Sequence, residues 1–144
     1  MSGFTSFKFN YWDSVGTIQQ LINDWQPAQC KTEKDYETSL YNFLRSSLPG
    51  IVVTPQYAFG RAKTDIAISD KLAIEIKKDL NDTSEFQRLI GQVVQFKDWK
   101  GYFLILLTGK TDNNLRDDLQ KKIDDLNNSF GASIDPKITI IDKK

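Results

Sequence analysis

The sequence predicts a single α/β domain in which helices flank both faces of a mixed β-sheet, with the core order α-β-β-β-α-β-α-β. The chain has 144 residues, the size of one domain, and contains no internal repeat, low-complexity tract or linker. Segments with apolar residues at helical spacing alternate with short segments rich in β-branched residues. An antiparallel meander followed by β-α-β units therefore gives the predicted sheet.

An N-terminal arm, residues 1–31, precedes this core and is expected to dock on it. Apolar residues recur at helical spacing in the arm: Val15, Ile18, Ile22 and Trp25. Asp13 or Ser14 can cap the helix and Pro27 ends the segment.

The core begins with a helix that Thr32 can cap, and Leu48-Pro49-Gly50 ends it. Three segments with strand character follow, at residues 51–59, 63–69 and 72–77. Pro55 lies in the first of them and indicates an edge strand or a bulge, because proline donates no ladder hydrogen bond.

The second half of the chain reads as β-α-β units. A capping box at residues 82–85 opens a third helix, and Gly101 is placed to end it. The continuous apolar run 102–107 is typical of a strand covered on both faces. A fourth helix is expected to stop near Phe130-Gly131, and residues 137–141 form a last strand. The apolar stripe of the fourth helix contains Leu115, Leu119, Ile123 and Leu126.

Composition excludes several classes of chemistry. The chain has no histidine, which removes His-dependent nucleases, Ser-His and Cys-His hydrolases and the common His-containing zinc sites. Cys30 is the single cysteine, so no intrachain disulfide forms. Lys plus Arg equals Asp plus Glu, which argues against coating nucleic acid by bulk charge. The remaining chemistry uses carboxylates, Lys and Arg, amides, hydroxyls and a hard metal ion.

No apolar run approaches the ~20 residues that span a bilayer. The N-terminus also lacks the basic segment and apolar stretch of a secretory signal. We therefore expect a cytoplasmic protein without a membrane partner.

Charged residues on two neighbouring strands carry the candidate chemistry. Ile74 and Ile76 alternate with Glu75 and Lys77, so the two charged side chains share one face of a strand. An acidic residue two positions before a lysine occurs four times in the chain. Only this instance is embedded in apolar alternation after a strand that carries an aspartate, Asp65.

The turn between these strands decides whether Asp65 joins the cluster. We predict a three-residue loop at 69–71, which pairs Ile68 with Leu72 and places Asp65 directly opposite Glu75. A two-residue loop would move Asp65 out of this register and split the cluster across two faces. Two carboxylates held this close repel each other unless a divalent cation lies between them.

Here the sequence resembles a known family. Thr64-Asp65, nine intervening residues and Glu75-Ile76-Lys77 resemble the PD-(D/E)xK motif of restriction-endonuclease-like proteins, with Thr64 in place of the motif's proline. The family core has the same order of elements, and the resemblance covers residues 32–141. It implies a metal-dependent nuclease that hydrolyses phosphodiester bonds, with DNA as the expected substrate, by means of a metal-activated water.

The resemblance also implies a cofactor and its ligands. Mg²⁺ would be bound by Asp65, Glu75 and the main-chain carbonyl of Ile76, and Mn²⁺ is expected to substitute for it. Two neighbouring carboxylates favour the charged form of Lys77. We therefore expect Lys77 to orient water and to stabilise charge on the phosphate rather than act as a general base.

Two further residues extend the resemblance. Family members often carry a glutamate in the first core helix, and Glu37 is the best candidate because it lies on the apolar stripe with Leu40 and Leu44. Gln92-Val-Val-Gln-Phe96 resembles the Gln-x-x-x-Tyr element of the RecB-like branch, and points to Gln92 as a site residue. A helix-surface carboxylate and a polar helix face are the structural alternatives for the two residues.

Nucleic acid is the expected partner. Basic residues near the motif are candidate phosphate contacts, and Trp99 is a candidate for stacking on a base. Solubility alone also explains such charges. Duplex cleavage would fit a homodimer that presents two sites to two strands, as the resemblance implies. The candidate phosphate contacts are Arg61, Lys63, Lys78 and Arg88.

Two other functions remain open. The chain is alternatively a catalytically silent nucleic-acid-binding or scaffolding subunit on the same fold, which its near-minimal core and zero net charge favour. It is also compatible with an unrelated α/β module whose hairpin charges form structural ion pairs. Fold alone does not separate these functions, because one scaffold hosts many.

Overall fold

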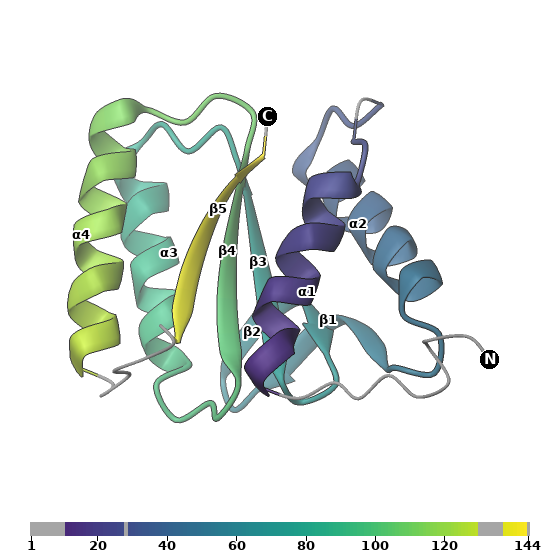
Figure 1. Ribbon diagram of the computed structural model, residues 1–144. Coiled ribbons are helices and arrows are strands. Elements are labelled where there is room, and N and C mark those ends of the chain that lie inside the picture. Colours follow the sequence, from purple (N-terminus) through teal and green to yellow (C-terminus); the bar gives the residue numbers. More distant parts are fainter. Residues whose placement is uncertain (1–10, 28, 130–136, 144) are drawn as a thin grey trace.

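The computed structural model describes residues 11–27, 29–129 and 137–143, and confirms the predicted α/β class with helices on both faces of a mixed sheet (Figure 1). The helices are α1 (Tyr11–Asp24), α2 (Glu33–Ser47), α3 (Thr83–Gln95) and α4 (Asn113–Ser129). The strands are β1 (Val53–Phe59), β2 (Ala62–Ile68), β3 (Leu72–Lys78), β4 (Tyr102–Thr108) and β5 (Ile138–Lys143).

The five strands follow their chain order in the sheet, β1-β2-β3-β4-β5. The first three pair antiparallel, and β3, β4 and β5 pair parallel. The carboxyl ends of β3, β4 and β5 therefore meet at one edge of the sheet, the upper edge in Figure 1. β1 lies at an edge of the sheet, as Pro55 predicts.

Two apolar cores hold the three layers together. β4 is buried on both faces, as its continuous apolar run predicts, and alternate residues of this strand enter alternate cores. The core under α3 and α4 includes Leu89, Val93, Phe103, Ile105 and Leu119. The core under α1 and α2 includes Ile18, Leu40, Leu44, Ile74 and Leu104.

Local sequence signals set the starts of two helices. Thr32 forms a full capping box with Asp35 at the start of α2, and the Asp82 side chain accepts the backbone N–H of Glu85 at the start of α3. Both predicted starts are confirmed. α1 begins at Tyr11, so the prediction that Asp13 or Ser14 caps it is wrong.

Gly101 has a different role from the predicted one. α3 ends at Gln95, and Gly101 is buried just before β4. A Cβ atom at this position would collide with the carbonyl of Lys71 in the β2–β3 turn. The glycine therefore allows close approach between that turn and β4. The predicted stop of the fourth helix at Phe130-Gly131 lies outside the described residues.

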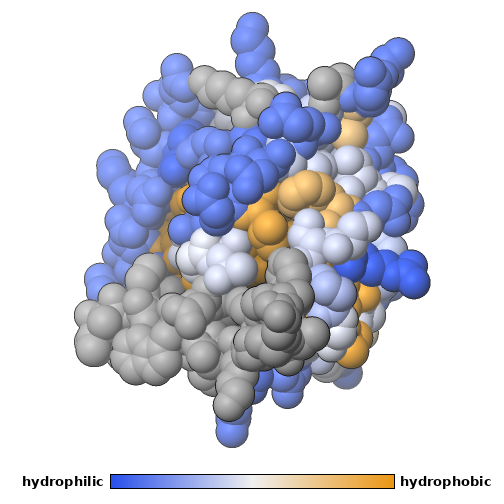
Figure 2. Space-filling view, turned by 45° about the vertical axis from the view of Figure 1, so that its right-hand side comes forward, coloured by the Kyte–Doolittle hydropathy of each residue, from blue (hydrophilic) through white to orange (hydrophobic). Residues whose placement is uncertain are grey.

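Hydrophilic side chains cover much of the visible face, with hydrophobic atoms exposed in a strip near its middle (Figure 2). Among the described residues, the exposed large hydrophobic side chains are Val52 and Val94. In that same part of the chain, none of the helices has the length and apolar character needed to cross a membrane.

Candidate active site

The β2–β3 hairpin has the register predicted from its sequence. Ile68 pairs with Leu72, and the ladder continues to the pair of Ile66 and Ile74. Ser69 opens the three-residue turn with a φ of 50°, in the left-handed region. The next position along this register brings Asp65 opposite Glu75, where the regular ladder stops.

The two carboxylates take over the hydrogen bonds at this break. The Asp65 Oδ2 atom accepts the backbone N–H of Ile76 at 2.8 Å, and the Glu75 Oε1 atom accepts the backbone N–H of Asp65 at 3.3 Å. Each acidic side chain is thereby fixed by the strand that carries the other. The geometry brings the two carboxylates into one gap between β2 and β3.

The ladder between β1 and β2 is also interrupted at Asp65. Pairs form on either side of this point, but Gln56 and Asp65, which face each other in the register, do not pair. Gln56 adopts a φ of 51°, which is unfavourable for a residue with a side chain. Asp65 therefore lies between two interruptions of the sheet.

Burial makes this carboxylate pair electrostatically unfavourable. Glu75 is 5% exposed, and its pKa is raised to about 8, first by burial and then by the charge of Asp65. Lys77, the Asp65 N–H and the Gln92 amide each partly offset this rise in pKa. Burial is also the largest cause of the raised pKa of Asp65. In the absence of a cation, the pair therefore retains a proton near neutral pH.

Lys77 lies at the same end of the sheet. Its side chain is 15% exposed, and its Nζ atom is 3.9 Å from the Oε1 atom of Glu33 on α2. The ammonium lowers the pKa of both Asp65 and Glu75. One cation therefore stabilises three carboxylates at this site.

Helix α2 contributes two carboxylates. Glu37 is 7% exposed, accepts hydrogen bonds from Gln56 and Lys34, and raises the pKa of Asp65 through its charge. Glu33 lies one turn earlier, and its own pKa is raised mainly by burial. Sequence reasoning missed Glu33, although its spacing of four from Glu37 places both on one face of the helix.

Gln92 reaches the hairpin from α3. Its side-chain amide donates to the carbonyl of Lys63 on β2 and lowers the pKa of Glu75. Sequence reasoning missed Gln56, which donates a hydrogen bond to Glu37, because no pattern in the sequence predicts its left-handed backbone conformation. The structure thus brings Asp65, Glu75, Lys77, Glu37 and Gln92 to one region, with Glu33 and Gln56 beside them.

The residues predicted to contact nucleic acid do not gather around the candidate site as its acidic residues do. Arg61, Lys63 and Arg88 are exposed, and Lys78 forms an ion pair with Asp79. Trp99 is 3% exposed and donates its indole N–H to the Tyr102 carbonyl. The prediction that Trp99 stacks on a base is therefore wrong, because the ring is part of the core.

The donor set fits a hard divalent cation. Mg²⁺ prefers oxygen ligands and usually retains several waters beside one or two carboxylates. Asp65 supplies a half-buried carboxylate and Glu75 a buried one, and the carbonyl of Ile76 belongs to the same stretch of β3 as Glu75. Within the described residues there is no group of three or more acidic, cysteine or histidine residues arranged to hold a metal. Binding would therefore depend on this pair.

The chain was also compared with known proteins. No family model matches it, and no curated protein matches it. Among solved structures it is similar to SfsA from Pyrococcus furiosus in complex with Ca²⁺, with a TM-score of 0.45 and 14% sequence identity. The match covers 76% of this chain and 54% of the SfsA chain, so the chain spans about half the length of that protein.

Proposed function

We propose that this chain is a metal-dependent nuclease of the PD-(D/E)xK type that hydrolyses phosphodiester bonds in DNA. The observation that carries the proposal is the pair formed by the half-buried Asp65 and the buried Glu75, with Lys77 beside it, at a break in the sheet. A solvated, structural ion-pair network does not account for this pair, because burial raises the pKa of both carboxylates.

Each residue has a role that follows from its surroundings. Asp65, Glu75 and the Ile76 carbonyl would hold Mg²⁺, which supplies Lewis-acid activation of water and of the phosphate when bound. Lys77 lies near three carboxylates and would stabilise negative charge on the phosphate. Gln92, whose amide lowers the pKa of Glu75, would help to position that carboxylate, and Glu37 would act on Asp65 through its charge.

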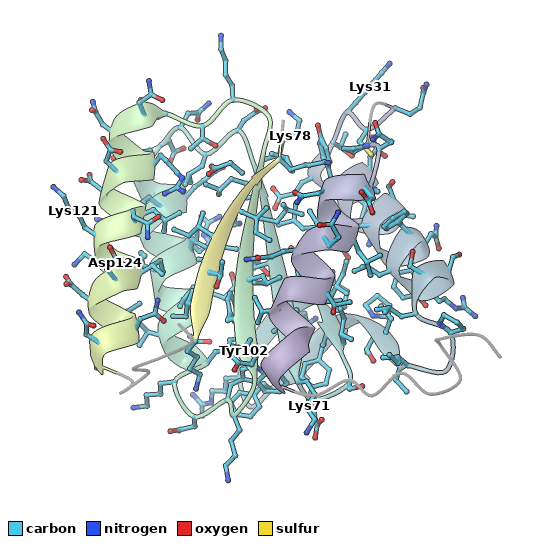
Figure 3. The ribbon with its side chains drawn as sticks, in the orientation of Figure 1. Lys31, Lys71, Lys78, Tyr102, Lys121 and Asp124 are labelled. Atoms are coloured by element: carbon cyan, nitrogen blue, oxygen red, sulfur yellow. The ribbon has the colours of Figure 1, made fainter. Side chains whose placement is uncertain are left out.

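The test is cleavage of plasmid and branched DNA with Mg²⁺ or Mn²⁺. Asp65→Asn, Glu75→Gln and Lys77→Met should each reduce the rate at least about 100-fold, as removal of a transition-state contact does. Asp124→Asn is the matched control, because Asp124 lies on α4 away from the hairpin (Figure 3). Equal, metal-independent cleavage by wild type and Glu75→Gln would refute the proposal.

A second candidate is a catalytically silent nucleic-acid-binding subunit. One oxygen of each carboxylate already accepts a backbone N–H, which favours a structural role for the pair. This candidate predicts binding of labelled DNA in EDTA that Lys77→Met leaves unchanged, with no cleavage under any metal. A dependence of DNA affinity on Ca²⁺ and on Asp65 would exclude it.

A further inference from the structure

A cavity of about 790 Å³ opens beside the candidate active site, at the edge where β4 and β5 end. It lies between Tyr36 of α2, Leu107 of β4, and the loop and first turn that lead into α4. Its volume falls in the range of pockets that hold small organic ligands, and far exceeds the need of one phosphate ion. The cavity therefore has room for a nucleotide-sized group.

Positive charge is in excess in this cavity. Lys110, Arg116 and Lys143 line it, against the single carboxylate of Asp142. Asp142 is engaged by Arg116 through an ion pair at 3.0 Å. In the part of the chain that the structure describes, neither Lys110 nor Lys143 has an ion-pair partner, and the Lys143 ammonium donates to the Asn23 carbonyl. Two positive charges thus remain for an anion.

The N-terminus of α4 does not supply the attraction for an anion in this cavity. Asp112 caps the helix, and its Oδ1 atom accepts the backbone N–H of Leu115 at 2.9 Å. A carboxylate already occupies the place where a helix N-terminus would hold an anion. The lysine side chains, rather than the helix, must supply the binding energy.

Strand register places the cavity next to the candidate active site. Leu107, which lines the cavity, is the β4 residue directly paired with Lys77. Tyr36 lies three residues after Glu33, the partner of Lys77, on α2. Lys78 appears at the same end of the sheet, near the end of β5, in Figure 3. A strand held at Lys77 would therefore pass this cavity.

We propose that the cavity binds the nucleotide adjacent to the cleaved bond, with its phosphate at Lys110 and Lys143 and its base against the ring of Tyr36. Base stacking on an aromatic ring is compatible with any sequence. The phosphate contacts set the position of the strand rather than its sequence. This inference rests on the proposed function for its substrate, and its test does not require cleavage.

The experiment measures binding of thymidine 5′-monophosphate by calorimetry, with thymidine and inorganic phosphate as comparison ligands. Lys110→Ala should weaken nucleotide binding about tenfold, the effect of losing one contact to a charged group, and Lys110→Arg should restore it. Lys121→Ala on the outer side of α4 is the matched control (Figure 3) and should bind as wild type. Wild type should bind the nucleotide more tightly than phosphate or thymidine, because it contacts both parts.

The same variants are then tested with a labelled single-stranded oligodeoxynucleotide in Ca²⁺. Lys110→Ala should reduce the dependence of log affinity on log salt by about 0.7, the value for one phosphate on a single strand. Equal binding of nucleotide and oligonucleotide by Lys110→Ala and wild type would overturn the proposal, even if wild type cleaves DNA. If Lys110→Ala loses binding but wild type never cleaves DNA, the result would support the proposed nucleotide pocket and refute the proposed nuclease function.

Discussion

Replacing Glu75 by Gln should stabilise the protein at alkaline pH while it abolishes the proposed metal site. The glutamine amide has nearly the same shape, and its oxygen can still accept the Asp65 N–H that the Glu75 Oε1 atom accepts. What the substitution removes is a buried negative charge beside another carboxylate. Glu75 is thus expected to destabilise the metal-free protein and to be retained for function.

The pH window follows from the raised pKa. Below the ordinary value of 4.5 the Glu75 carboxyl is protonated in both the folded and the unfolded chain, and contributes no pH dependence. Between 4.5 and about 8 the folded protein retains a proton that the unfolded chain has lost, so the free energy of unfolding falls as pH rises. At ~1.4 kcal/mol for each pH unit, the fall has a ceiling of about 5 kcal/mol.

The assay is urea denaturation followed by tryptophan fluorescence, at pH values from 4 to 9 without divalent ions. Glu75→Gln and wild type should unfold at similar urea concentrations at about pH 4, and the variant should be more stable by about 2–5 kcal/mol at about pH 9. Asp35 and Asp79, whose pKa values are lowered, affect both proteins equally and cancel in the difference. Asp124→Asn serves as the control for charge removal alone.

Mg²⁺ should narrow the difference in stability between wild type and Glu75→Gln. At a concentration ten times its dissociation constant, a ligand that binds only the folded state stabilises it by about 1.4 kcal/mol. Wild type should gain this amount at pH 8, and Glu75→Gln should gain none. If the free energies of unfolding of the two proteins instead change in parallel between pH 4 and 9, the buried charge of Glu75 does not destabilise the folded protein.

Three further predictions test the surroundings of the site. Gly101→Ala should lower the midpoint of thermal unfolding, because the added Cβ atom would meet the Lys71 carbonyl. Gly91→Ala on α3 should instead raise the stability by up to about 1 kcal/mol, because this position has space for a Cβ atom. Equal midpoints for the two variants would contradict the close approach at Gly101. Thr108→Val should be neutral or stabilising by up to about 2 kcal/mol in urea denaturation, because the buried hydroxyl has no hydrogen-bond partner among the described residues; a loss of stability would reveal a hidden one. Gln56→Gly should be more stable than Gln56→Ala by about 1 kcal/mol, because the backbone φ of 51° at this position favours glycine. Strands ordinarily favour alanine over glycine, so a more stable Gln56→Ala would show that the backbone at this position is not strained.

Features that depend on neighbouring residues were predictable from the sequence. Thr32 caps α2 through the N–H of Asp35, three residues away, and the turn length alone sets the pairing of Ile68 with Leu72. The continuous apolar run of β4 specifies a strand buried on both faces. Each of these follows from a local hydrogen bond or from a repeat of two or 3.6 residues.

The features that sequence reasoning missed are set by contacts between distant segments. Gly101 is required by a carbonyl thirty residues earlier in the chain, and the indole N–H of Trp99 is buried against the Tyr102 carbonyl. Gln56 binds Glu37 from another element, across nineteen positions. No periodicity encodes such contacts, because they arise only when the layers pack.

The break in the sheet at Asp65 connects the fold to the proposed chemistry. A regular ladder through this position would satisfy the backbone groups without the acidic side chains. Instead both neighbouring ladders are interrupted, and the carboxylates of Asp65 and Glu75 are drawn into the gap, where burial raises the pKa of each. A cation in that gap would neutralise the pair and free both carboxylates from the need for a proton. Under the proposed function, the interrupted pairing would be the means by which the β-hairpin presents two carboxylates to a metal.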